Sequence, residues 1–113
     1  MLFFVEVDHV KSGQMPTPEA GRAFIEQIIL PTIARAEQLI AEKKILSGGP
    51  AAGRISLRLM IEADSLEDVD QIISSLPLWT VAETRVTPLI AFTDRRKHVQ
   101  MLLERLVSMP SHP

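Results

Sequence analysis

Charged side chains that could carry acid–base chemistry lie inside otherwise apolar segments of this 113-residue chain. Four of them are Glu6, Arg58, Glu83 and Arg85. An arginine can hold the carboxylate of a substrate through two parallel hydrogen bonds, and a glutamate in a poorly hydrated cavity can carry a proton. The alternative is that the same charges form ion pairs between neighbouring strands and only stabilise the fold.

His9 ends the first of these segments, and its imidazole could act as an acid or a base near neutral pH. Asp8 cannot simply orient it, because neighbouring residues of a strand point to opposite faces. Trp79, the only tryptophan, could either line a pocket or fill one end of the core. The candidate catalytic residues are Glu6, Glu83 and His9, and the candidate substrate-binding residues are Arg58, Arg85, Trp79, Phe4 and Met60.

The composition excludes several kinds of site. The chain has no cysteine, which excludes disulfides, thiolate metal sites and a cysteine nucleophile. His9, His98 and His112 are scattered without a repeated spacing, so we expect no metal and no cofactor. A net charge of −2, with four Phe, one Trp and no Tyr, argues against a nucleic-acid partner.

The length and the apolar content predict one folded domain. The first ten residues lack the basic and long apolar regions of a secretory signal. No run reaches the ~18–20 apolar residues of a membrane span. We therefore expect an unexported, cytoplasmic protein with no membrane partner.

Alternating hydrophobicity predicts four strands, at 2–8, 45–46, 54–62 and 82–87. The third is the clearest, because Ile55 and every second residue after it are apolar. The run Ser-Gly-Gly-Pro after the second strand predicts a turn that ends near residue 53, rather than a phosphate-binding loop. A further loop is expected at 11–15.

Helical spacing and capping signals predict three helices. The first is expected to begin with Thr17 as cap and Pro18 at the first position, and to carry a wide apolar stripe of Phe24, Ile28, Ile29, Ile33, Ala36, Leu39 and Ile40. Pro31 should kink or divide it. The second helix should start at the Ser65 cap and end at Pro77, and the third should be capped by Thr93-Asp94 and followed by a frayed tail from residue 108.

The element order βαββαβ followed by a helix predicts an α+β, ferredoxin-like fold with a four-stranded antiparallel sheet. Residues 1–92 would form the barrel domain, and residues 93–113 the C-terminal helix and tail of the same domain. Both long helices should cover the sheet face that carries Val5, Leu57 and Val86. The opposite face would stay open, so we expect a second copy to close it into a dimeric α/β barrel, with the last helix packing across the partner.

Four short segments resemble the muconolactone isomerase-like proteins of the dimeric α/β barrel superfamily. They are DSL at 64–66, LPLW at 76–79, to which it leads, ETRVTPL at 83–89, and the opening MLFFV at 1–5. The second strand of that family is rich in His, Trp and Arg, whereas this chain has ILSGG at 45–49.

The resemblance implies a homodimer, or an assembly of dimers, that binds a small organic acid between subunits and isomerises it by proton transfer. Other barrels of this type leave two alternatives. One is a non-catalytic ligand-binding or stress-responsive module. The other is a cofactor-independent monooxygenase, against which the lack of Tyr and the single Trp argue.

Overall fold

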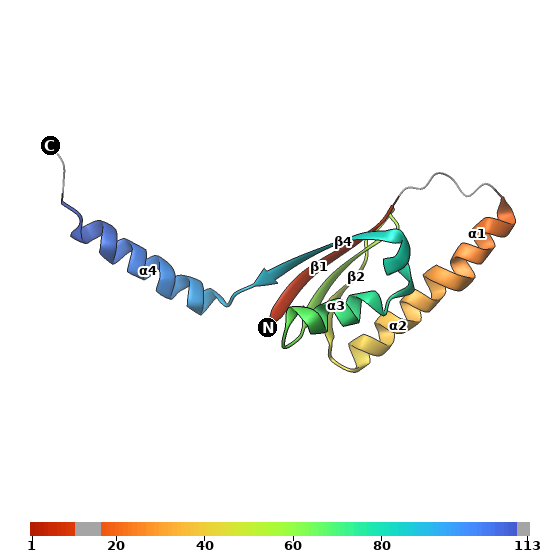
Figure 1. Cartoon of the computed structure of the whole chain (residues 1–113), viewed down its shortest axis with the longest axis horizontal. Helices are drawn as coiled ribbons and strands as arrows, with labels where there is room; N and C mark the ends of the chain where they lie inside the picture. The colour runs from red at the N-terminus through yellow and green to blue at the C-terminus, as the bar shows by residue number, and fades with distance from the viewer. Residues whose placement is uncertain (11–16, 111–113) are drawn as a thin grey trace.

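Four antiparallel strands form the sheet, in the spatial order β2-β3-β1-β4 (Figure 1). The structure is a computed structural model that describes residues 1–10 and 17–110; the loop expected at 11–15 lies outside the described residues. The strands are β1 (Leu2–His9), β2 (Ile45–Pro50), β3 (Ser56–Glu62) and β4 (Ala82–Leu89). As the two β-α-β halves predict, β1 and β3 are central and β2 and β4 are the edges.

The first helical region is divided just before Pro31. It consists of α1 (Pro18–Phe24), a π-helical turn η1 (Ile25–Ile29) and α2 (Leu30–Ala41). Proline has no N–H to donate, and its ring pushes against the preceding helical turn. The helix therefore forms one wider, π-helical turn there, in which the Leu30 N–H donates to the Ile25 carbonyl, five residues back. Thr17 caps α1 as expected, its hydroxyl accepting the Ala20 N–H at 3.1 Å.

The second helical region is short and tightly capped. Ser65 accepts the Asp68 N–H at 3.1 Å and begins α3 (Leu66–Ser74). A 3₁₀ turn, η2 (Pro77–Val81), then leads into β4. The buried Leu78 N–H donates to the hydroxyl of Thr32 at 2.9 Å, and this bond ties η2 to α2.

One face of the sheet carries the core. Phe3, Val5 and Val7 of β1 are fully buried there, beneath α2 and α3. The prediction that the helices cover the face of Val5 and Leu57 is confirmed. Further core residues come from every layer: Leu39, Ile45, Leu59, Ile61, Ala63, Val69, Ile72, Ile73, Leu76 and Leu78. None of the described helices lies against the other face of the sheet (Figure 1).

The glycine-rich run lies in a strand, so the prediction of a turn there is wrong. Gly48 pairs with Leu59 and Gly49 with Arg58, with a register shift between Ile45 and Ser47. Gly48 has a φ of +119°, and a Cβ there would collide with the Arg58 carbonyl oxygen, so only glycine fits this close approach. The turn begins after Pro50 and includes Ile55, which is exposed and outside β3, contrary to the expectation.

The last helix, α4 (Phe92–Ser108), extends away from the sheet and the other helices (Figure 1). With α4 extended in this way, the chain has principal extents of 73 × 35 × 23 Å. Its N-cap is Ala91 and no side chain caps it, so the expected Thr93-Asp94 cap is wrong. None of its residues is buried. In the described part of the chain, no helix is long and apolar enough to cross a membrane.

Candidate functional site

A row of three charges crosses the open face of the sheet. Glu6 lies opposite Arg58 on one side and opposite Arg85 on the other, in the register of the central strand β1 with β3 and β4. The Arg58 Nε is 3.5 Å from Glu6 Oε1, and the Arg85 Nη1 is 3.9 Å from Glu6 Oε2. Glu6 is 23% exposed and Arg58 30%, whereas Arg85 is 79% exposed. In this row the Arg58 guanidinium is partly buried beside Glu6, whereas the Arg85 guanidinium is largely exposed to solvent.

The next row holds a second carboxylate that the sequence did not identify as part of the site. Arg58 Nη1 donates to Asp8 Oδ1 at 3.0 Å, and Arg54 Nη2 approaches the same oxygen at 3.5 Å. Asp8 stands directly opposite Glu83 on β4, so two acids face each other across the strands. Among residues 1–10 and 17–110, Asp8 has two arginine partners and Glu83 has no ion pair.

An apolar row completes this surface on the other side of Glu6. Phe4 lies between Met60 and Thr87 in the strand register. The Phe4 and Met60 side chains are half-buried although no described helix covers them. Six predicted site residues of β1, β3 and β4 thus share one face of the sheet: Glu6, Arg58, Glu83, Arg85, Phe4 and Met60.

His9 is not brought together with this group. It follows Val7 on the core side of β1, and its ring lies 5.0 Å from that of Phe24, between ring centroids, at 49°. The sheet therefore separates its imidazole from Glu6. Trp79 lies in η2 with its side chain 42% exposed, while the neighbouring Leu78 fills the core. The functional roles given to His9 and Trp79 stay predictions.

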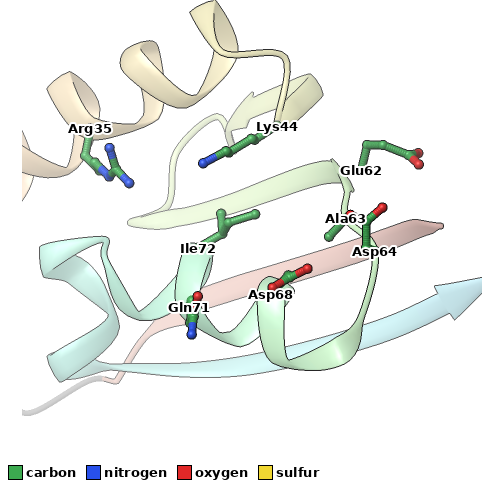
Figure 2. Close-up of a pocket in the computed structure, with 8 residues that line it drawn as sticks. All are labelled: Arg35, Lys44, Glu62, Ala63, Asp64, Asp68, Gln71 and Ile72. Atoms are coloured by element: carbon green, nitrogen blue, oxygen red, sulfur yellow. The ribbon is translucent and has the colours of Figure 1, made fainter.

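A second concave surface lies on the helical side of the molecule. It is a groove of about 440 Å³ between α2 and α3. Figure 2 shows Arg35 and Lys44 on the α2 side and Asp68 and Gln71 on α3. Arg35 donates to Ser75 Oγ at 3.0 Å and to Gln38 Oε1 at 2.9 Å, so its charge is already engaged in joining the two helices.

A metal site is not formed by the side chains that the structure describes, since no group of three or more His, Asp or Glu residues is placed to hold an ion. The members of the open-face network that the sequence missed are Asp8 and Arg54. The signal for Asp8 was present in the strand alternation, which puts it on the face of Glu6. The predicted strand at 54–62 also puts Arg54 on this face, but in the structure Arg54 lies in the turn before β3, and it approaches Asp8 from there.

Comparisons with known proteins agree with this geometry at the level of the fold. No protein-family model and no curated protein sequence matches the chain. A solved structure of muconolactone isomerase superposes on 80% of this chain and 90% of its own, with a TM-score of 0.66 and 23% identity. The chain has the muconolactone isomerase fold.

A second solved structure supports the same conclusion. It is 5-chloro-2-hydroxyhydroquinone dehydrochlorinase from Burkholderia phenoliruptrix AC1100, in complex with 2,5-dihydroxybenzoquinone. It covers 83% of this chain and 98% of its own, with a TM-score of 0.59 and 22% identity. The predicted resemblance and the α+β, ferredoxin-like fold with a four-stranded antiparallel sheet are therefore confirmed, while the sheet of the single chain is not closed into a barrel. At this level of identity the similarity concerns the fold.

Proposed function

We propose that this protein binds a small organic anion on the open face of the sheet and isomerises it by proton transfer. The observation that carries the proposal is the state of Arg85. Its guanidinium is 79% exposed, and its one ion-pair contact among the described residues is the 3.9 Å approach to Glu6. A planar guanidinium in this state keeps its paired donors available for a carboxylate.

Glu83 is the best-placed proton carrier in this proposal. It lies two residues before Arg85 on β4, so both side chains leave the strand on the same face, about 7 Å apart along it. Glu6 and Asp8 are engaged by arginines, whereas Glu83 has no ion pair among the described residues. Its carboxylate would take a proton from one carbon of the bound anion and return one to another carbon. The double bond moves, and no electrons are gained or lost.

A second copy of the chain would enclose the open face of the sheet as a chamber between two subunits. One protomer leaves Phe4, Met60 and the charged rows on an uncovered face, which is too apolar for open water and too charged for a core. A homodimer with sheet facing sheet would remove water from these charges and strengthen their electrostatic interactions with a ligand. Higher assemblies built from such dimers, the cytoplasmic location and the single-domain organisation over 1–113 stay predictions.

Calorimetric titration with two anions tests the binding step. Muconolactone and 2,5-dihydroxybenzoquinone are the first probes, because the names of the two similar structures point to them. We expect Arg85→Ala to weaken binding roughly 10- to 100-fold, the value of a charge-assisted hydrogen-bonded pair. Arg22→Ala is the matched control, since Arg22, on α1, pairs with Glu26 of η1, away from the open face. Unchanged binding by Arg85→Ala would remove the proposed clamp.

Deuterium exchange tests the catalytic step separately. Incubation of muconolactone with the protein in D₂O should place deuterium on carbon, as followed by NMR, and Glu83→Gln should abolish exchange while binding persists.

The second candidate function is a non-catalytic binding module. The observation in its favour is that Arg58 contacts both Glu6 and Asp8, as expected of ion pairs that stabilise a barrel. Binding without any exchange would support this alternative.

A further inference from the structure

Two apolar surfaces remain uncovered in the protomer. The first, the α4 stripe, consists of Phe92, Val99, Leu102, Leu103 and Leu106. Their spacing of seven, three, one and three residues places them on one side of the helix. Phe92 is 92% exposed and the other four between 40 and 64%. A helix with such a stripe and no buried residue is not stabilised by its own chain, because helices gain most of their stability from packing.

The second surface, the α2 flank, consists of Ile29, Ile33 and Ile40, which follow each other at helical spacing along η1 and α2. The sequence predicts that they belong to the core-facing stripe, but Ile33 and Ile40 are exposed and only Leu39 of that stripe is fully buried. At one end of the flank is an apolar hollow of about 140 Å³. Its walls include Ile29, Ile33, Pro50, Ile55, Leu57 and Leu78.

The two surfaces belong to opposite edges of the molecule. The α2 flank borders the hollow next to the end of β2, and α4 follows β4. Four strands span about 14 Å from edge to edge, whereas the link between β4 and α4, residues 90–91, can extend only about 7 Å. The helix therefore starts on the β4 side of the sheet, away from the α2 flank of its own chain, and in the structure it extends further away from that flank (Figure 1).

We propose that α4 of each protomer packs along the α2 flank of a second copy of the chain. The inference rests on the face-to-face dimer of the proposed function. When the two-fold axis runs parallel to the strands, the β4 edge of one sheet comes over the β2 edge of the other. The helix after β4 then starts at the partner's β2 edge. A turn about residues 90–91 would carry its 17 residues, about 25 Å of helix, around that edge and onto the partner's α2 flank.

The charges around the two surfaces are complementary. Arg95, Arg96 and Lys97 make the start of α4 basic. Glu37 borders the α2 flank one turn after Ile33 and, among the described residues, takes part in no ion pair. A basic helix with an apolar stripe fits a flank of this kind, because the stripe excludes water while the charges at its rim set the register.

Disulfide cross-linking between different chains tests the docking. The natural chain has no cysteine, so Ile33→Cys and Leu103→Cys provide the only thiols. Both positions are exposed, so neither change disturbs the core. After the two single variants are mixed and oxidised, we expect a covalent dimer on a non-reducing gel. A second pair tests whether α4 is shifted along the flank. Ile40→Cys, seven residues after Ile33, is mixed with Val99→Cys or with Leu103→Cys.

Glu104→Cys is the matched control, because it is adjacent to Leu103 but on the polar side of α4. It should cross-link to Ile33→Cys at least tenfold less. Three results would overturn the docking. The first is no cross-link at Ile33 or Ile40, and the second is a dimer formed by Leu103→Cys alone, which would mean that two α4 helices pair. The third is a disulfide within one chain when Ile33→Cys and Leu103→Cys are combined in the same chain. Light scattering separates the docking of α4 from the face-to-face dimer of the proposed function. A dimer that forms no cross-link would contradict only the docking, whereas a monomer would contradict both.

Discussion

Arg58 donates to Asp8 at 3.0 Å, although the two residues are diagonal neighbours and not cross-strand partners. The residue opposite Asp8 is Ser56, and the residue opposite Arg58 is Glu6, which Arg58 also approaches at 3.5 Å. One partly buried guanidinium therefore bridges two carboxylates of β1. Arg85, on the other side of Glu6, is left with its one long contact.

Arg58→Met should destabilise the protein because it leaves two partly buried carboxylates without their shared partner. We expect a loss of about 1–3 kcal/mol in the free energy of unfolding, measured by urea denaturation. Arg22→Met, which removes only an exposed pair between Arg22 of α1 and Glu26 of η1, should change this free energy by no more than about 0.5 kcal/mol. Equal losses in the two variants would mean that the bridge contributes nothing beyond a surface ion pair.

Thr32→Val should weaken the attachment of η2 to α2. The variant keeps the shape of the side chain but leaves the buried Leu78 N–H without its acceptor. The expected cost is about 1–3 kcal/mol in thermal or urea unfolding. Thr80→Val removes a hydroxyl that is exposed and bonds only within η2, so it serves as the control and should be nearly neutral. A neutral Thr32→Val would contradict the role given to this bond.

Gly48→Ala should disrupt the pairing of β2 with β3. Its Cβ would meet the Arg58 carbonyl oxygen at a backbone φ that side chains rarely adopt, so we expect a loss of at least about 2 kcal/mol. Gly49→Ala is a neighbouring control with open space around the new Cβ, and it should change stability by about 0.5 kcal/mol or less. Urea unfolding of both variants measures the difference, and similar values for the two would contradict the close approach at Gly48.

Light scattering at micromolar concentration should give about twice the chain mass of 12.6 kDa. Met60→Lys places a charge in the middle of the open face and should shift the protein to a monomer that is still folded, because this side chain does not belong to the core. Gln71→Lys on α3 is the control and should remain dimeric. A monomeric natural chain, or a dimeric Met60→Lys variant, would contradict closure through the open face.

The sequence alone was sufficient for the architecture. Strand alternation around Val5 and Leu57, the caps at Thr17 and Ser65, and the position of Pro31 predict the elements and the helix-covered face. These are local signals, because the side-chain period and the capping bonds involve residues close in the chain. The same alternation also assigns Glu6, Arg58 and Arg85 to one face of the sheet.

Only the tertiary structure decided how these residues meet. The register between β1 and β3 sets the diagonal bridge from Arg58 to Asp8 and the approach of Arg54. That register joins residues about 50 positions apart in the sequence. Gly48 lies in a strand rather than a turn because of its close contact with β3, which no local pattern encodes. The α2 flank and α4 are exposed because the single sheet of this chain buries only one of its faces. Hydrophobic spacing predicts that a helix surface will be covered, but it does not predict which chain covers it.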